Sequence, residues 1–251
     1  TAKGFNPVAL DAGEMALEYG VTREMQDAWA LRSQVLCARA YAEGKFRIGE
    51  ELMPVVIPQK RGKPVVIERD ESPRETSMEA LAKLTPIYGS PTVTAGNAPP
   101  ISAGASAVLC MRRAEAERRG LEPLATVLCA VASAAAPREI AQIPAYTIRK
   151  ALERADMEIG EMDLIEINEA FAAMPLVSTK ILADGDAGRW KALQERTNVN
   201  GGAIAIGHPV GASAGRLVMT LAYELRRRGG GVGVAAICGG LAQGEAVILK
   251  V

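Results

Sequence analysis

The sequence predicts a layered α/β fold for its second half, and three observations support this. Beyond Pro123, short apolar runs alternate with segments of helical pattern, as expected of a sheet covered by helices. The chain ends in two apolar runs joined by a glycine-rich turn, a pattern that predicts a buried β-hairpin. The 4% aromatic content and the 25 glycines suit helices packed closely on a sheet.

Composition excludes several classes of protein. The chain has 251 residues, of which 49% are apolar, enough for one large domain or two modest ones. Its 29 basic and 29 acidic residues argue against a nucleic-acid-binding surface. No apolar run approaches the length of a membrane span, and no secretory signal opens the sequence. The four cysteines lack metal-ligand spacing, so we expect reduced thiols, no metal site and a cytoplasmic location.

The first half is expected to combine helices with a small hairpin. Predicted helices cover residues 11–19, 22–44, 77–84 and 113–120, and predicted strands cover 51–58, 64–67 and 105–111. Thr22 is expected to cap the second helix, which Gly44 ends. The apolar spacing predicts that the inward face of this helix consists of Met25, Ala28, Trp29, Val35, Leu36 and Ala42.

The second half supplies the elements of the predicted α/β layer. Predicted strands cover residues 125–133, 164–167, 231–238 and 245–251, and predicted helices cover 144–155, a segment after 168–172, and 212–228. The charged stretch 184–196 is expected to be a solvated surface insertion.

Three polar residues fall at the corners between these elements. Asn168 follows a short strand, His208 lies in a glycine turn before a helix, and Cys238 ends an apolar run. Such corners meet along one edge of an α/β sheet, where ligands bind. A neutral imidazole and a thiol beside an amide could transfer protons and stabilise an oxyanion. His208 is the only histidine in the chain. From residue type alone, a single histidine is expected to form structural hydrogen bonds more often than to act in catalysis.

The motifs around these residues resemble signatures of the thiolase family. Asn168-Glu-Ala-Phe-Ala, the stretch 200–213 (Asn-Gly-Gly-Ala-Ile-Ala-Ile-Gly-His-Pro-Val-Gly-Ala-Ser) and Cys238-Gly-Gly-Leu-Ala-Gln-Gly follow the family's order. Segments 22–33, 81–86 and 92–98 also resemble the family. The resemblance implies a thiolase-like layered α/β/α fold.

The resemblance also implies a division of the chain into three parts. Residues 1–92 would form the loop, or lid, domain. Residues 93–120 would supply the returning strand and helix of an incomplete N-terminal thiolase domain. Residues 121–251 would form the C-terminal thiolase domain.

The implied activity is acyl transfer between coenzyme A thioesters, by cleavage of 3-ketoacyl-CoA or by condensation. Cys238 matches the family's acid/base cysteine, whose thiol pKa the surroundings can tune, and His208 matches the activator of the nucleophile. Asn168 matches the residue that holds a water in the first oxyanion hole, and the backbone N–H of Gly240 matches a donor of the second. The expected substrate contacts are Phe171, Ala98, Pro99 and Gly207.

The expected ligands are acyl-CoA and coenzyme A, with no separate cofactor. The basic turn containing Lys60, Arg61 and Lys63 is a candidate for contacts with the phosphates of coenzyme A. A solvated turn is the simpler interpretation of those charges. Residues 99–104 read Pro-Pro-Ile-Ser-Ala-Gly where the family usually has Ser-Gly followed by polar residues, which puts substrate contacts at that wall in doubt.

The chain lacks the family's nucleophilic cysteine in its Cys-Gly-Ser-Gly-like setting. Cys37, Cys110 and Cys129 are each expected to be small core residues. We therefore expect the nucleophile on a missing N-terminal segment or a partner chain, whether separately encoded, cleaved or absent from a fragment. The polypeptide alone should have no thiolase turnover.

Two further expectations concern assembly. The strand predicted at 105–111 would expose an apolar edge that invites pairing with another chain, and thiolases are homo- or hetero-oligomers. The alternative function is a non-catalytic, thiolase-like subunit that binds acyl-CoA or acts as a scaffold.

Overall fold

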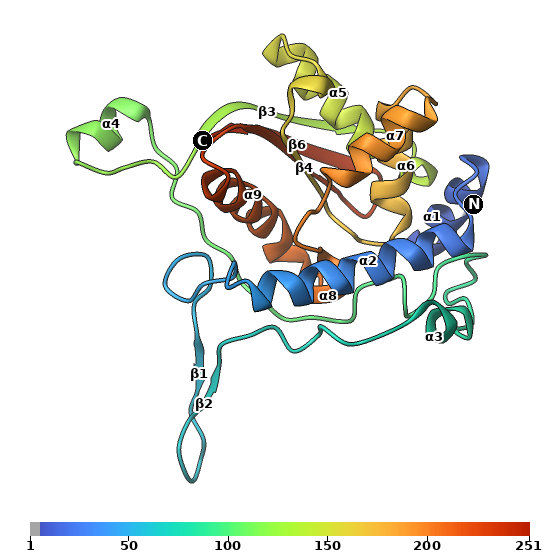
Figure 1. The fold of residues 1–251 in the computed structure, drawn as a ribbon, viewed down its shortest axis with the longest axis horizontal. Coiled ribbons are helices and arrows are strands. Elements are labelled where there is room, and N and C mark those ends of the chain that lie inside the picture. The colour runs from blue at the N-terminus through green and yellow to red at the C-terminus, as the bar shows by residue number, and fades with distance from the viewer. Residues whose placement is uncertain (1–5) are drawn as a thin grey trace, which may run out of the picture.

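A four-stranded mixed sheet organises the computed structural model, which describes residues 6–251 (Figure 1). The first five residues of the predicted loop domain lie outside the described residues. The strands are β3 (Thr126–Ala134), β4 (Leu164–Ile167), β5 (Val232–Cys238) and β6 (Gln243–Lys250), in the order β3-β6-β5-β4. β5 and β6 form the predicted antiparallel hairpin, while β4 runs parallel to β5.

Helices cover the two faces of this sheet, which confirms the predicted α/β layers. α5 (Ile143–Ala155) packs on β3 and β6, and α9 (Val210–Arg227) packs on β4 and β5. Alternate strand residues separate the faces: Ile165 and Val234 join the core that contains α5, whereas Leu164 and Ala235 pack with α9. Because successive side chains point to opposite faces and both sets lie in a core, β4 and β5 are buried on both sides.

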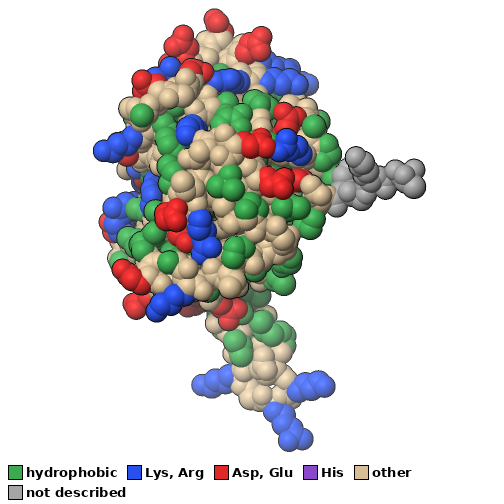
Figure 2. Space-filling model, turned by 90° about the vertical axis from the view of Figure 1, so that its right-hand side faces the viewer, with side chains coloured by type: hydrophobic (Ala, Val, Ile, Leu, Met, Phe, Trp, Pro, Cys, Tyr) green, Lys and Arg blue, Asp and Glu red, His purple; other side chains and the backbone are tan. Residues whose placement is uncertain are grey.

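The remaining elements surround that layer. They are α1 (Val8–Glu18), α2 (Arg23–Ala42), β1 (Val55–Ile57), β2 (Val65–Ile67), α3 (Met78–Ala82), α4 (Arg113–Arg118), α6 (Ala173–Leu182), α7 (Ala187–Glu195), α8 (Ala203–Ile206) and two short 3₁₀ turns, Pro137–Glu139 and Ile159–Glu161. The hairpin β1–β2 projects from the body (Figure 1), and Lys and Arg side chains gather at its end (Figure 2). No helix within residues 6–251 is long and apolar enough to cross a membrane.

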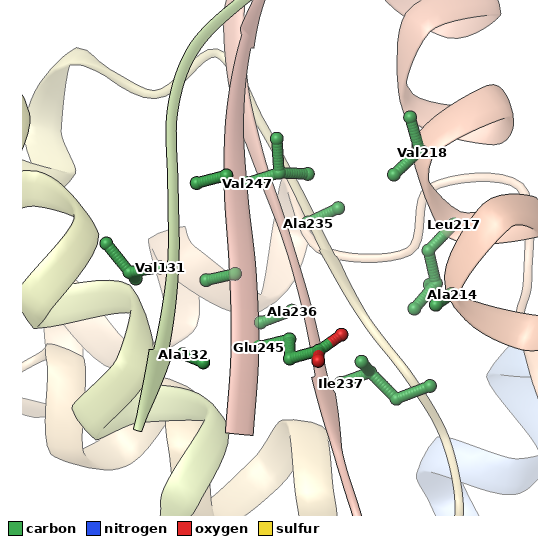
Figure 3. Close-up of a pocket in the computed structure, with 12 residues that line it drawn as sticks. Val131, Ala132, Ala214, Leu217, Val218, Ala235, Ala236, Ile237, Glu245 and Val247 are labelled. Carbon is green, nitrogen blue, oxygen red and sulfur yellow. The ribbon is translucent and has the colours of Figure 1, made fainter. Parts of the chain in front are cut away.

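The α9 side of the sheet leaves an apolar cavity of about 370 Å³ next to β3 and β6. In Figure 3, Leu217 and Val218 of α9 face Ala235 and Val247 of the sheet across this space. Most of the lining is aliphatic. α9 therefore covers only part of this face.

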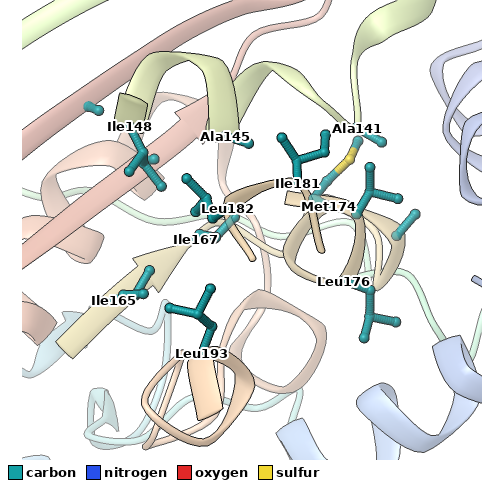
Figure 4. Close-up of a cluster of buried hydrophobic side chains, with 14 of the residues drawn as sticks. Ala141, Ala145, Ile148, Ile165, Ile167, Met174, Leu176, Ile181, Leu182 and Leu193 are labelled. Carbon is teal, nitrogen blue, oxygen red and sulfur yellow. The ribbon is translucent and has the colours of Figure 1, made fainter. Parts of the chain in front are cut away.

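The opposite side of the sheet is densely packed. Ile165 and Ile167 of β4 meet Ile148 of α5, and Met174 of α6 lies in the same cluster (Figure 4). All four side chains are almost fully buried, and each such burial stabilises the fold by about 1.5–3 kcal/mol. The end of β4, where Asn168 begins the next segment, is therefore held by a rigid core.

The structure corrects the face predicted for the long helix α2. Thr22 caps it as expected, accepting a hydrogen bond from the N–H of Met25 at 3.3 Å. However, Ala28 and Val35 are exposed, and the buried face instead carries Gln26, Asp27, Ser33 and Gln34 beside Trp29, Ala30, Cys37 and Ala40. The apolar spacing predicted the wrong face because polar side chains of α2 can be buried where they are hydrogen-bonded to other segments.

The strand predicted at 105–111 was wrong, whereas the stretch 184–196 is mostly exposed, as expected of a surface insertion. Residues 105–111 form no strand, because no neighbouring strand within residues 6–251 pairs with them. Ser106 instead donates to the carbonyl oxygen of Ala212 at 2.8 Å, and Val108 and Leu109 are exposed. The stretch 184–196 contains helix α7, capped by Asp186, whose carboxylate accepts from the N–H of Arg189.

Candidate active site

Asn168 and Cys238 lie at the same edge of the sheet. β4 and β5 are parallel, with Ile167 opposite Ala236. The N–H of Asn168 continues this ladder by donating to the carbonyl oxygen of Ala236 at 3.0 Å. Cys238, the last residue of β5, follows two positions later. The two predicted corners therefore meet at the carboxyl ends of neighbouring parallel strands, where α/β sheets bind ligands.

His208 reaches this edge from the turn between α8 and α9. Its Nε2 lies 3.2 Å from Nδ2 of Asn168, and its Nδ1 lies 2.6 Å from Oγ of Ser213. Burial, and then the positive charge of Arg216, lower the pKa of His208. The imidazole is therefore neutral at pH 7, as a general base must be.

Gly207 makes the histidine turn possible. Its φ is +98°, a conformation that costs little only for glycine. A Cβ on Gly207 would lie 2.3 Å from Oγ of Ser102, and that hydroxyl accepts a hydrogen bond from the N–H of His208 at 3.2 Å. The segment around Ser102 thus fixes the backbone from which the imidazole projects.

Glu169 is a buried hub that the sequence did not single out. Its carboxylate accepts hydrogen bonds from Trp29 Nε1, Ser33 Oγ, Asn198 Nδ2 and the N–H of Ile204. It is fully buried and ties α2 to the segment that leads to His208. The signal in the sequence was an acidic residue inside an otherwise apolar motif.

A second group missed by the sequence lies behind Asn168. Nη2 of Arg216 donates to Oδ1 of Asn168 at 3.4 Å, and Nη1 lies 3.5 Å from Oε2 of Glu166. Glu166 is a buried strand residue of β4. Burial raises the pKa of its carboxyl, although Arg216 opposes the shift. Arg216 lies eight positions after the histidine, on α9.

The predicted substrate residues form a wall beside the motif of Asn168. Ala98 packs in a small cluster with Phe171 and Val93. Pro99, the next residue, is half-buried. The N–H of Ala172 donates to the carbonyl oxygen of Asn97 at 2.9 Å, which joins the two motifs. Gly207 is buried beside His208, whereas Gly240 lies on the exposed turn between β5 and β6.

The four cysteines are free thiols in different environments. Burial raises the pKa of Cys238 to about 12, so its surroundings here do not bring the thiol towards neutrality. Cys37 is buried in α2 with a pKa of about 12, and Cys129 is buried in β3. Both fit the predicted core role. Cys110 is exposed, so the prediction of a core role was wrong for this residue.

Within residues 6–251, no group of three or more His, Cys, Asp or Glu side chains is arranged to hold a metal ion. Lys60, Arg61 and Lys63 lie exposed between β1 and β2, at the end of the projecting hairpin.

Family comparisons agree with this arrangement. The model described as "Thiolase, C-terminal domain" matches residues 121–251, and "Thiolase, N-terminal domain" matches residues 4–114. The chain belongs to the thiolase family. Because the N-terminal model matches most of the first half, it does not support the prediction that the N-terminal segment is missing.

Curated proteins similar to this chain extend the comparison. An acetyl-CoA acetyltransferase of Syntrophomonas wolfei is 43% identical over 92% of this chain and 57% of its own length. A beta-ketoadipyl-CoA thiolase of Pseudomonas knackmussii is 43% identical over 98% of this chain and 60% of its own length. The chain thus spans about 57–60% of the curated relatives it matches.

Solved structures show the same fold. The acetyl-CoA acetyltransferase of Bacillus anthracis superposes with a TM-score of 0.86 at 36% identity, over 96% of this chain and 59% of that one. Human mitochondrial 3-ketoacyl-CoA thiolase gives 0.83 at 34% identity, over the same shares. The fold predicted from the motifs is therefore confirmed.

Proposed function

We propose that this thiolase-family chain carries the acid–base machinery of an acyl-CoA C-acyltransferase. Its substrates would be 3-ketoacyl-CoA and coenzyme A in cleavage, or two acyl-CoA molecules in condensation. The observation that carries the proposal is the contact between the Asn168 amide and the neutral His208 imidazole, at the strand edge where β5 ends in Cys238. The names of the relatives support the same reaction class.

The first half-reaction in the cleavage direction uses both catalytic groups. Nε2 of His208 takes the proton of a nucleophilic thiol, and the thiolate attacks the 3-keto carbon of the substrate. The bond between C2 and C3 breaks, and its electron pair forms the enolate of acetyl-CoA. The thiol of Cys238, protonated because burial raises its pKa to about 12, gives its proton to that carbon.

The second half-reaction restores the groups. The Cys238 thiolate takes the proton of an incoming coenzyme A thiol, which attacks the thioester of the acylated nucleophile. The new acyl-CoA leaves, and the freed thiolate recovers its proton from His208. Asn168 and the N–H of Gly240 would stabilise oxyanions at the two carbonyls.

None of the four cysteines is placed as the acylated nucleophile would have to be. Cys37 and Cys129 are buried in regular elements, and Cys238 serves as the acid. Cys110 lies on an exposed irregular segment. No hydrogen bond among the described residues joins its thiol to a base. We propose that another polypeptide segment or partner chain supplies the acylated cysteine, in a homo- or hetero-oligomer. The polypeptide alone would then be inactive.

Acetoacetyl-CoA cleavage tests the proposal. The assay compares the purified chain with the complex isolated from its native source, whose components a native mass spectrum identifies. The complex should be active, and His208→Ala or Cys238→Ala should each reduce turnover by about 100-fold or more. Cys129→Ala is the matched control, because it removes a thiol remote from the site.

Two outcomes would overturn parts of this assignment. Turnover by the purified chain alone would refute the external nucleophile. A loss of less than about tenfold in the His208 and Cys238 variants, with acyl-CoA binding retained, would favour the non-catalytic acyl-CoA-binding subunit.

A further inference from the structure

A chain of hydrogen bonds passes through His208 from one side of the ring to the other. On one side, Nδ1 lies 2.6 Å from Oγ of Ser213, which donates to the carbonyl oxygen of Pro209 at 3.0 Å. On the other side, Nε2 lies 3.2 Å from Nδ2 of Asn168, whose Oδ1 accepts from Nη2 of Arg216 at 3.4 Å.

At each end of this series of hydrogen bonds, the direction of donation is fixed. A peptide carbonyl only accepts and a guanidinium only donates. Because the single hydroxyl proton of Ser213 goes to the carbonyl of Pro209, its oxygen must accept the proton on Nδ1 of His208. Because the Asn168 oxygen faces Arg216, the amide group faces Nε2, which must accept. Both ends therefore require the same neutral tautomer, with the proton on Nδ1.

Arg216 is held in place by a buried partner. Glu166 is 3% exposed, and its Oε2 lies 3.5 Å from Nη1 of Arg216. That oxygen accepts no hydrogen bond from the described residues, so the guanidinium is the charge that faces it. Arg216 and Ser213 are three residues apart on α9 and thus neighbours on its surface. α9 therefore carries both Ser213, which contacts the imidazole, and Arg216, which contacts Asn168 on its other side.

We propose that Arg216, anchored by Glu166, is a positioning residue that orients the Asn168 amide and thereby keeps Nε2 of His208 unprotonated. In water the neutral histidine side chain carries its proton mostly on Nε2, so the site reverses the intrinsic preference. The consequence for the proposed acyl transfer is that Nε2 keeps a lone pair, which takes the thiol proton once the thiol replaces the Asn168 amide as its hydrogen-bond partner. This consequence rests on the proposed function, whereas the tautomer itself does not.

The test exploits the single histidine of the chain. Two-bond ¹H–¹⁵N NMR spectra of the protein, freed of any histidine tag, report the protonation of both ring nitrogens of His208. In the native protein, above the imidazole pKa, Nδ1 should give the shift of a protonated nitrogen and Nε2 that of an unprotonated one.

Three variants separate orientation from charge. Arg216→Lys keeps the positive charge but loses the fork that bridges Glu166 and Asn168. Arg216→Gln loses both, and Glu166→Gln weakens only the anchor. Both Arg216 variants should raise the share of the tautomer protonated on Nε2, while the hydrogen bond from Ser213 to the carbonyl oxygen of Pro209 still favours the native tautomer. Glu166→Gln should give a smaller change in the same direction.

Arg32→Lys is the matched control. Arg32 is another half-buried arginine, but it donates to the carbonyl oxygens of Gln194 and Thr197 and makes no hydrogen bond to Asn168. Its replacement should leave the native tautomer unchanged. Backbone amide spectra of the sheet show whether each variant is folded.

Two results would refute the proposal. One is a native protein whose His208 is protonated on Nε2. The other is a folded Arg216→Lys variant with the same tautomer populations as the native protein. Neither depends on catalysis, so failure of the acyl-transfer proposal is seen separately in the cleavage assay. In an active complex, Arg216→Lys should lower kcat by about tenfold or more while the KM for acyl-CoA changes little.

Discussion

The amide of Asn168 meets the imidazole of His208 at 3.2 Å, although the two residues are 40 positions apart in the sequence. Asn168 is placed by the pairing of β4 with β5. His208 is placed by a turn whose backbone packs against Ser102. Two independent supports therefore converge on one contact, and each can be removed separately by mutation.

Glu169, the residue after Asn168, holds the segment that follows β4 through four buried hydrogen bonds. Replacing it with Gln would turn one acceptor oxygen into a donor that faces N–H and O–H groups already pointing at it. Because a buried, unsatisfied donor is costly, we expect Glu169→Gln to reduce the free energy of unfolding by about 3 kcal/mol. Urea denaturation followed by circular dichroism measures the change.

The matched control for this variant is Glu195→Gln on the exposed end of α7. It should change the free energy of unfolding by less than about 0.5 kcal/mol. A Glu169→Gln protein as stable as this control would show that the hydrogen bonds to the carboxylate contribute nothing net.

Gly207 provides the second support. Gly207→Ala should destabilise the protein by about 2 kcal/mol, because its φ is +98° and the new methyl group would overlap Oγ of Ser102. Gly211→Ala is the comparison, since a Cβ at Gly211 would meet no atom within 4 Å and should leave stability unchanged or slightly raised. Thermal denaturation of the two variants checks the order, and equal melting temperatures would contradict it.

Thiol chemistry distinguishes the cysteines. At neutral pH, iodoacetamide should modify Cys110 first, because it is exposed. Cys238 should react far more slowly, because burial raises its pKa to about 12 and only the thiolate is the nucleophile. Cys37, buried with a similar pKa, should react only after unfolding. Peptide mass spectrometry over time gives the order, and early labelling of Cys238 would mean that its thiol is more acidic than its burial implies.

The pH dependence of stability should reveal Glu51. Burial raises the pKa of this carboxyl to about 7, although Arg227 lies 3.3 Å away. A folded-state pKa above the unfolded value means that the native state holds the proton more tightly, so stability is lost as pH rises from about 4.5 to about 7. Glu51→Gln removes that loss.

The measurement compares melting temperatures of variant and native protein at about pH 5 and about pH 8.5. The variant should gain relative to the native protein at the higher pH. Glu50→Gln, a change at an exposed neighbour, is the control. A difference between Glu51→Gln and native protein that does not depend on pH would contradict the raised pKa.

Sequence reasoning predicted the residues of the candidate site but not the residues that hold them in place. Asn168, His208 and Cys238 stand out because each lies at a corner between predicted elements, within a motif of recognisable order, and the structure brings Asn168 and His208 into contact at the strand edge that also carries Cys238. Glu169 and Arg216 were missed because their partners lie on α2, on β4 or elsewhere along the chain, and such long-range contacts leave no local pattern.

The same reason explains the errors in the fold. The buried face of α2 is polar, so its apolar spacing pointed to exposed residues such as Val35. Strand β3 and the β5–β6 hairpin were predictable because each is a local apolar run bounded by turn residues. The segment 105–111 has the composition of a strand, but a strand also needs a neighbour, which composition does not show.

That segment leads to the last prediction. Leu109 in this segment and Ile101 shortly before it are among the most exposed large apolar side chains, with relative exposures of 81% and 104%. The segment leads to α4, which stands apart from the body in Figure 1. An exposed segment with apolar side chains, whose backbone is not paired in a sheet, favours association with another chain. Sedimentation velocity should therefore show association that increases with concentration, and Leu109→Lys should weaken it by about tenfold or more, as expected when a charge must be desolvated at an interface. Val56→Lys, on the exposed hairpin, is the matched control and should leave association unchanged. A native protein that stays monomeric at every concentration, or equal effects of the two lysines, would show that residues 105–111 do not mediate assembly.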